Sequence, residues 1–264
     1  MREILSDLVA EQQHLDQFLQ TLRDRQWSLD TPAEGWTIQD TVSHLAYVES
    51  FAAEVLEEGK KRVDREKITD LDAWTEIGAE QGRGRRHQEI IEWWRFGRAD
   101  VVDALSRMAA TDRVPWLYGD MSAESFANIR LMETWAHGLD IKAAILDRIT
   151  PLPAPPEGIE EEEEWNDPLA DTTRLRHIAS LGQRSLPFAF EQAGAEFPSQ
   201  GIRVEVMGPL YAAWRFGPED TDQVIKGMAG DWCRLVVQRQ SADETGLKAV
   251  GEHAELALEI ARAY

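Results

Sequence analysis

Cysteine is almost absent from this sequence, because Cys233 is the only one among 264 residues. A single cysteine cannot form a disulfide within the chain, and it cannot supply the several thiolates of a structural zinc site. Its apolar surroundings favour a packed thiol over a nucleophile. Any metal bound by this chain must therefore take its ligands from histidine and carboxylate side chains.

Long hydrophobic runs are also missing. No stretch approaches the roughly 20 apolar residues that a membrane-spanning helix needs. The first ten residues, Met1 to Ala10, are acidic and amphipathic and lack the apolar core of a signal peptide. Together with the scarcity of cysteine, this predicts a cytoplasmic protein without a membrane partner.

Basic residues are few, with 28 Lys and Arg against 48 Asp and Glu and a formal net charge of −20. Such a charge opposes binding to nucleic acid or to an anionic membrane. It also attracts cations nonspecifically, so weak metal binding alone would say little about function. We expect a small-molecule substrate as the partner, and the sequence leaves open whether the chain is a monomer or a homodimer.

Residues 1–150 are predicted to form a four-helix bundle. Apolar residues recur at helical spacing in four long segments: 2–25, from about 37, 86–108 and 122–147. Thr37 can cap the second helix, and Asp40 in its first turn suits the helix dipole. A shorter helix is expected over residues 70–80.

Residues 151–170 differ in composition from what precedes them. Four prolines lie between Pro151 and Pro156, and five consecutive glutamates follow from Glu160 to Glu164. Five like charges repel one another and cannot pack, so we predict an exposed linker. The alternative is a cation-binding segment.

Residues 171–264 are predicted to form a small α+β domain. Residues 171–193 are helical in pattern, residues 202–206 and 213–216 alternate like two strands, and Gly208-Pro209 supplies a turn between them. Two further helices are expected over 229–240 and 252–263. The fold class of the whole chain is therefore α+β.

Three side chains of the predicted bundle form a candidate metal site. Glu133 and His137 are four residues apart, so they share one face of a helix and can reach a common ion. His44 lies beside the apolar stripe of the second helix. Two histidines and one glutamate would leave a coordination position open, as in catalytic zinc sites. The alternative for His44 is a core histidine bonded to a carbonyl.

Two sequence phrases resemble the signature segments of a known superfamily. They are Gly35-Trp-Thr-Ile-Gln-Asp-Thr-Val-Ser-His44-Leu-Ala and Glu133-Thr-Trp-Ala-His137-Gly-Leu-Asp140. Their order and separation are similar to those of the DinB-like superfamily, in particular its mycothiol-dependent maleylpyruvate isomerases. The resemblance extends over nearly the whole chain. It implies an up-down-down-up bundle, a sterol-carrier-like C-terminal domain, and a divalent metal, zinc, held by His44, Glu133 and His137.

The resemblance also implies an activity. Mycothiol or another low-molecular-weight thiol, or water, would be activated at the metal toward a small electrophilic substrate, in an isomerase or thiol S-transferase reaction. The C-terminal half, around Trp214 to Asp220 and Asp231 to Arg239, departs from the isomerases, which puts the substrate in doubt. The alternatives are a noncatalytic metal- or ligand-binding protein and a metal-dependent hydrolase.

Further polar residues are candidates for supporting roles. Asp40 and Asp140 lie one helical turn from His44 and His137, where each could accept a hydrogen bond from an imidazole. The alternatives are helix capping for Asp40 and solvation for Asp140. Arg130 shares a helix face with Glu133 and could steer an anionic substrate or pair with an acid.

An arginine of the C-terminal domain assists the reaction in the isomerases that this chain resembles. By position, Arg239 is the first candidate for a catalytic arginine and Arg234 the second. The aromatic residues near the motifs are expected to pack in the core and not to form a ligand cage: Trp36, Trp93, Trp94 and Trp135. The remaining histidines are interpreted as ordinary residues: His14, His87, His177 and His253.

Overall fold

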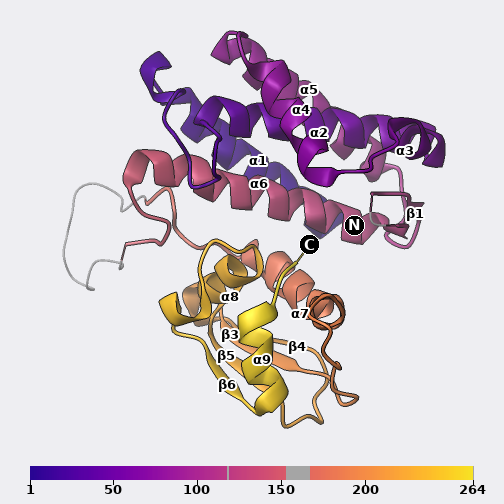
Figure 1. Cartoon of the computed structure of the whole chain (residues 1–264), viewed down its shortest axis with the longest axis vertical. Helices are drawn as coiled ribbons and strands as arrows, with labels where there is room; N and C mark the ends of the chain where they lie inside the picture. Colours follow the sequence, from indigo (N-terminus) through magenta and orange to yellow (C-terminus); the bar gives the residue numbers. More distant parts are fainter. Residues whose placement is uncertain (118, 153–166, 264) are drawn as a thin grey trace. The chain divides into compact units, whose positions relative to one another are not determined.

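The computed structural model describes residues 1–117, 119–152 and 167–263, and it separates into two compact units (Figure 1). The first unit is Met1–Leu169 and the second is Ala170–Tyr264. The glutamate run from Glu160 to Glu164 lies outside the described residues. Among the helices that are described, none is long and apolar enough to cross a membrane.

Four long helices form the bundle of the first unit, as predicted. They are α1 (Arg2–Gln20), α2 (Ile38–Glu58), α5 (His87–Ser106) and α6 (Ala123–Leu146). Helix α2 packs against α5, and α1 lies beside α6 (Figure 1). The first helix ends five residues before the predicted end, and a short 3-10 helix follows at Asp24–Gln26.

The core of the bundle is built from apolar side chains of all four helices. One buried cluster contains Leu15, Leu19, Trp27, Ile38, Val42, Leu45, Ala46, Ile90, Ile91, Trp94 and Ile141. Each fully buried large side chain contributes roughly 1.5–3 kcal/mol of hydrophobic stabilisation. The stability of the bundle therefore comes chiefly from packing, which leaves its polar interior positions free for other roles.

Local capping sets the start of α2 where the sequence predicted it. The Thr37 hydroxyl accepts a hydrogen bond from the Asp40 amide at 3.2 Å, and the Asp40 carboxylate accepts one from the Thr37 amide at 3.0 Å. This reciprocal capping box satisfies two backbone donors at the helix end. At the start of α6, the Ser122 hydroxyl accepts one hydrogen bond from the Ser125 amide at 3.1 Å.

Two shorter helices, α3 (Lys60–Glu66) and α4 (Leu71–Gly82), connect α2 to α5. Helix α4 matches the predicted short helix, whereas α3 was not predicted because its charged sequence has no apolar stripe. Glycines allow α4 to approach α2 closely. A Cβ atom on Gly78 would lie 2.8 Å from Tyr47 Cβ and 3.1 Å from the Cα of His44. Helix α4 thus lies directly against the backbone that carries His44.

A two-stranded antiparallel sheet precedes α6. Its strands are β1 (Arg113–Val114) and β2 (Met121–Ser122). Two residues per strand are too few for a hydrophobic alternation to be recognised, so these strands were not predicted.

The second unit combines helices with a four-stranded sheet in the order β4-β3-β5-β6. Its elements are α7 (Leu175–Gln192), β3 (Arg203–Met207), β4 (Ala213–Phe216), β5 (Val224–Met228), α8 (Ala229–Val236), β6 (Lys248–Val250) and α9 (Glu252–Ile260), with 3-10 helices at Pro209–Tyr211 and Ala242–Glu244. Strand β3 pairs antiparallel with β4 and parallel with β5, and β5 pairs antiparallel with β6.

The predicted hairpin is present as β3 and β4, but β5 and β6 were missed. The helix expected over 229–240 ends at Val236. Trp232 on α8 is fully buried and donates its indole N–H to the Ala179 carbonyl of α7 at 3.0 Å, which joins these two helices. The α+β fold class predicted from the sequence is confirmed.

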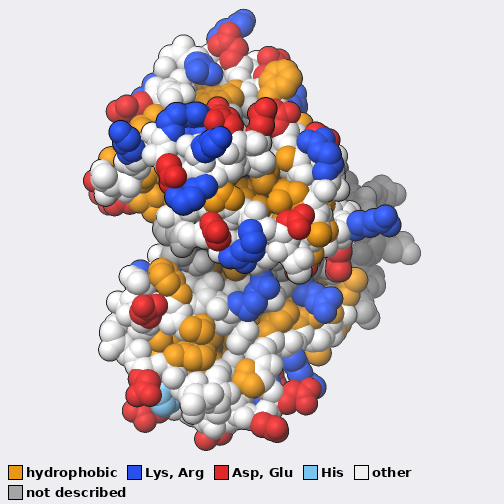
Figure 2. Space-filling view, turned by 90° about the vertical axis from the view of Figure 1, so that its right-hand side faces the viewer, with side chains coloured by type: hydrophobic (Ala, Val, Ile, Leu, Met, Phe, Trp, Pro, Cys, Tyr) orange, Lys and Arg blue, Asp and Glu red, His pale blue; other side chains and the backbone are white. Residues whose placement is uncertain are grey.

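The excess of acidic residues does not produce a uniform field on every surface. Figure 2 shows Lys and Arg side chains interspersed with Asp and Glu side chains and with apolar groups on one face. Surface charges of both signs screen one another at short range. The net charge of −20 alone therefore identifies no particular binding face.

Candidate metal centre

Helices α2 and α6 bring the three predicted ligands together in the first unit. Glu133 and His137 lie one turn apart on α6, and His44 faces them from α2. Oε2 of Glu133 lies 4.0 Å from Nε2 of His44 and 3.6 Å from Nε2 of His137. Each residue offers one donor atom, and the three donor atoms all lie within 4.8 Å of one another.

These distances fit an ion better than direct contacts between the side chains. An N–H···O hydrogen bond spans about 2.7–3.2 Å, so separations of 3.6 and 4.0 Å are too long. Donors bound to zinc at about 2.0–2.1 Å in a tetrahedron lie about 3.3 Å apart. Contractions of about 0.7 and 0.3 Å would bring Oε2 of Glu133 to that spacing from the two imidazole nitrogens. Two imidazole nitrogens and a carboxylate oxygen are also ligands that zinc accepts.

Burial and mutual contacts give the three groups different protonation behaviour. Burial lowers the pKa of His44, and the nearby Glu133 only partly offsets it. Burial acts to raise the pKa of Glu133, but His137, His44 and Arg130 hold it well below the usual value. Burial acts to lower the pKa of His137, yet Asp140 and Glu133 raise it overall. A proton therefore competes with a metal mainly at His137.

Asp140 lies beside the outer nitrogen of His137. Its Oδ2 is 3.3 Å from His137 Nδ1, and the residue is fully buried. The alternative that Asp140 is solvated is wrong, because packing around α6 removes it from water. A carboxylate at this nitrogen is the usual arrangement for orienting a ligating imidazole.

Asp40 was a candidate hydrogen-bond acceptor for His44, but its contacts lie at the start of α2. One carboxylate oxygen accepts from Thr37, and the other lies 2.9 Å from Nε of Arg83. Both oxygens are thus used at the start of α2. Asp40 therefore acts as a helix cap, which was the alternative prediction. The helix end offers unsatisfied amides that its carboxylate can reach.

Arg130 is buried and paired with an acid that the sequence analysis missed. Its guanidinium lies 3.9 Å from Glu49 of α2 and over the ring of Trp116 at 5.1 Å. Only 2% of Arg130 and 1% of Glu49 are exposed. Burial raises the pKa of Glu49 to about 7, although Arg130 opposes this. Of the two predictions for Arg130, steering an anionic substrate or pairing with an acid, the structure shows the pairing.

The four tryptophans considered in the sequence do not share one environment. Trp94 and Trp135 are buried in the core, as predicted, and Trp93 packs against it. Trp36 is only partly buried, and its ring centroid lies 4.8 Å from that of His44 and 6.2 Å from that of His137. The core prediction is wrong for Trp36, because its contact with α4 could not be read from the local sequence.

Comparison with known proteins places the chain in a family. The family model described as the mycothiol maleylpyruvate isomerase N-terminal domain matches residues 8–142. The chain belongs to this family. The resemblance seen in the two motifs is thus confirmed, and the matched region contains His44, Glu133 and His137.

Relatives of the full chain are found in Mycobacterium tuberculosis. An uncharacterized protein of strain ATCC 25618 / H37Rv is 32% identical over 262 residues, covering 98% of this chain and 94% of its own. A protein of strain CDC 1551 / Oshkosh gives the same values. The likeness to these relatives therefore includes the C-terminal unit as well as the isomerase-family domain.

Two crystal structures of the mycothiol-dependent maleylpyruvate isomerase, one of a histidine-to-alanine mutant, share the fold. They match 94% of this chain and 92% of their own, with TM-scores of 0.57 and 0.56 and 16% sequence identity. At this identity the match establishes a common fold.

The two arginine candidates of the C-terminal unit lie outside the family-matched region, and they differ from each other. Arg234 is 3% exposed and lies 2.9 Å from Asp171 and 3.4 Å from Asp231. This buried pairing indicates a structural contribution of Arg234, and a catalytic role for it stays a prediction. Arg239 donates to the Val237 carbonyl at 2.8 Å and lines a pocket of about 510 Å³. A catalytic role for Arg239 stays a prediction.

Cys233 and a surface pocket can be set apart from the metal centre. Cys233 is fully buried, and burial raises the pKa of its thiol well above the usual value, as expected for a packed cysteine.

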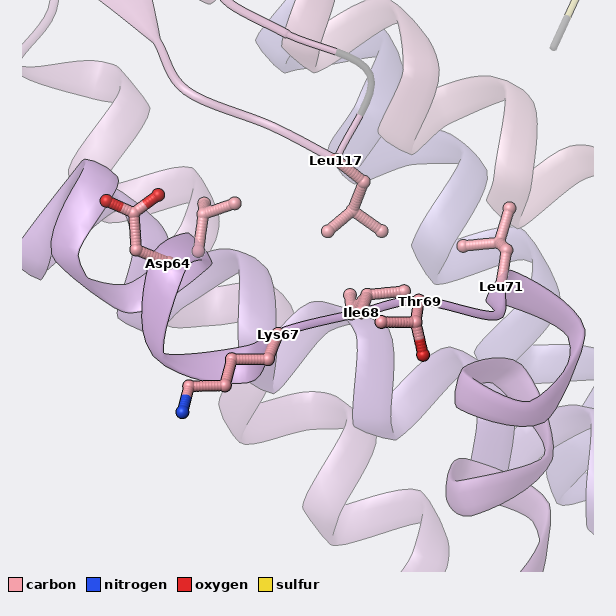
Figure 3. A pocket seen from close by; sticks show the side chains of 7 residues that line it. Asp64, Lys67, Ile68, Thr69, Leu71 and Leu117 are labelled. Carbon is pink, nitrogen blue, oxygen red and sulfur yellow. The ribbon is translucent and has the colours of Figure 1, made fainter.

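A pocket of about 460 Å³ in the first unit is lined by Val63, Asp64, Lys67, Ile68, Thr69, Leu71 and Leu117 (Figure 3). Asp64 is the one carboxylate among these lining residues, so they offer no comparable set of metal donors.

Proposed function

We propose that this chain is a zinc-dependent enzyme that activates a low-molecular-weight thiol toward a small electrophilic substrate. The observation that carries the proposal is the convergence of three donor atoms from His44, Glu133 and His137 at spacings too long for hydrogen bonds. Membership of the mycothiol maleylpyruvate isomerase N-terminal domain family supports mycothiol as the thiol.

Three protein donors would leave a fourth coordination position of zinc for another ligand. When bound, a zinc ion would supply Lewis acidity that lowers the pKa of a thiol or water at the open position. The residues of the chain would hold that ion and set its charge. Glu133 stays ionised because its pKa is low, and Asp140 fixes the ring of His137. His44 stays neutral near pH 7 because burial lowers its pKa.

The reaction would be an isomerisation by reversible thiol addition or an S-transfer to the electrophile. In both, the thiolate attacks an electron-poor carbon, and the two differ in whether the thiol leaves again. Thiolates are the nucleophilic form of thiols, so lowering the thiol pKa accelerates either reaction near neutral pH. Support for this step comes from the family alone, and the donor set would equally suit metal-dependent hydrolysis.

A noncatalytic metal- or ligand-binding protein is the second candidate. The environment of Arg130 favours it, because this arginine is buried and paired with Glu49 and does not offer a free charge to an anionic substrate. Both candidates require the same metal ligands. They differ in whether a thiol and an electrophile react at the site.

Activity measurements separate the two candidates. The zinc-loaded full chain would be incubated with maleylpyruvate, with and without mycothiol, and with His137→Ala as the control. We expect turnover that requires both the thiol and an intact His137. Zinc binding without any thiol-dependent turnover of maleylpyruvate or of a panel of electrophiles would favour the noncatalytic protein. Turnover that water supports equally well would favour a hydrolase.

A further inference from the structure

The indole of Trp36 contacts both histidines of the candidate metal centre. Its centroid lies 4.8 Å from His44 with the planes 47° apart, and 6.2 Å from His137 with the planes 27° apart. The two imidazoles themselves are 4.9 Å apart. Trp36 precedes the cap of α2, and its ring spans from a residue of α2 to a residue of α6.

A chain of polar contacts from α4 fixes this indole. Trp36 Nε1 donates to Glu76 at 2.9 Å, and Glu76 accepts from Arg83 at 2.8 Å. Arg83 also donates to Asp40 at 2.9 Å, and Asp40 caps the residue that follows Trp36. The contacts therefore close a loop that joins the start of α2, the indole and α4.

The two imidazoles differ in what else holds them. His137 has the carboxylate of Asp140 at 3.3 Å from its Nδ1. Within the part of the chain that the structure describes, Nδ1 of His44 makes no well-formed hydrogen bond, although the backbone of Thr75 on α4 lies near the imidazole. A ligating histidine normally depends on a group at its second nitrogen for its orientation. For His44, packing against the Trp36 indole adds to that orientation.

We propose that Trp36 is a positioning residue of the metal centre, held against His44 and His137 by Glu76 of α4. This inference rests on the proposed metal site and adds a residue to it. Among the described residues, the hydrogen-bond and ion-pair partners of Glu76 are Trp36 and Arg83, so Glu76 acts through the indole. Helix α4 thereby contributes to metal affinity although it supplies no ligand.

Zinc affinity of full-length variants tests this role. The dissociation constant would be measured by competition with a chromophoric chelator for Trp36→Ala, Trp36→Phe, Glu76→Ala and the double variant Trp36→Phe/Glu76→Ala. The matched control is Trp93→Phe, because Trp93 also loses one indole hydrogen bond, to Ser50 at 2.8 Å. The absorption spectrum of the cobalt-substituted proteins reports the geometry of the ligands, and circular dichroism reports the fold.

The size of each expected effect depends on the interaction that the substitution removes. Trp36→Ala weakens zinc binding about 10- to 100-fold, the usual effect of losing a group that orients a ligand, and alters the cobalt spectrum. Trp36→Phe and Glu76→Ala each weaken it about 2- to 10-fold, the range of one hydrogen bond. The double variant is no weaker than either single one, since both remove the same hydrogen bond. Trp93→Phe stays within about twofold of the wild type.

Three results would overturn the inference. They are Trp36→Ala with wild-type affinity and cobalt spectrum, Trp93→Phe with an equal loss, or full additivity in the double variant. Should Trp36→Ala fail to fold, Trp36→Phe and Glu76→Ala decide in the same way. Failure of the proposed metal site would be recognised separately from failure of the role of Trp36. In that case the wild-type chain itself would bind no zinc at micromolar concentration.

Discussion

Two buried polar groups lie along the same pair of helices, and they differ in how their charge is balanced. One is the candidate metal centre of His44, Glu133 and His137. The other is the pair of Glu49 and Arg130, with Arg130 one turn before Glu133 on α6. Both groups are removed from water by the same bundle, so burial alone does not distinguish them.

Counting charges shows the difference. When Glu49 is ionised, it and Arg130 carry one charge of each sign, so the pair sums to zero. Glu133 and its neighbour Asp140 carry two negative charges when both are ionised, and two neutral imidazoles add none. Buried charge is costly inside a protein unless it is paired. The raised pKa of His137 indicates that Glu133 and Asp140 favour positive charge at this position, and a divalent ion would supply more of it.

The largest effect should follow removal of a ligand. We expect His44→Ala or His137→Ala to weaken zinc binding by more than the roughly 100-fold that loss of a supporting group costs, while the protein stays helical because the apolar core is unchanged. Elemental analysis after dialysis and circular dichroism measure both properties. Glu49→Gln, in the Glu49–Arg130 pair, is the matched control and should keep its zinc. Full metal content in either alanine variant would show that the ligands are misassigned.

A smaller effect should follow loss of the carboxylate beside His137. Asp140→Asn removes one of the two negative charges and the contact that orients the ring, so zinc affinity should fall about 10- to 100-fold. The control is Asp16→Asn, since Asp16 is also a largely buried acid of the bundle but pairs with Arg95 and Arg98. Equal losses of affinity in the two variants would remove Asp140 from the site.

The Glu49–Arg130 pair should affect stability and not metal binding. Burial raises the pKa of Glu49 from 4.5 to about 7. The folded state then holds this proton more tightly than the unfolded state, so the stabilisation is present below about pH 4.5 and is lost as pH rises through about 7. Between pH 5 and 8 the metal-free wild type should therefore lose roughly 2 kcal/mol relative to Glu49→Gln, which cannot ionise.

Urea unfolding of both metal-free proteins at several pH values measures this difference. Removing the Glu49 carboxylate that pairs with Arg130 changes the free energy of unfolding of the variant by a constant amount. The informative quantity is therefore how that free energy depends on pH. Glu57→Gln, at an exposed position of α2, is the control and should follow the wild type. A parallel pH dependence of wild type and Glu49→Gln would mean that Glu49 stays ionised throughout and that the pair is fully charged.

Local sequence was enough to predict the four long helices and the shared helix face of Glu133 and His137. The start of α2 follows from Thr37 as its cap, and the shared face of Glu133 and His137 follows from their four-residue spacing. Both depend on residues within one or two turns. The prediction of the bundle succeeded for the same reason, because each long helix carries its own apolar stripe.

Contacts between distant segments could not be predicted. Strand β5 pairs in parallel with β3, and the pairing partner cannot be read from the residues of β5 itself. Trp36 was predicted to lie in the core because local sequence could not show its contact with Glu76, which is 40 residues away in sequence. Asp40 could suit either a cap or an imidazole partner, and only the position of Arg83 on the neighbouring connection decided between them.

The most direct test of the charge-balance account is the zinc affinity of the wild-type chain between pH 5 and 8. Protons must leave His137 before the metal binds, and the pKa of His137 is raised above 6.5. Affinity should therefore fall about tenfold per pH unit once the pH drops below that pKa, and more steeply when His44 also titrates at lower pH. Carboxylates remain ionised to about pH 4, so a site made of carboxylates alone, such as Glu160 to Glu164, would keep its affinity at pH 5. A constant affinity over this range would contradict the account.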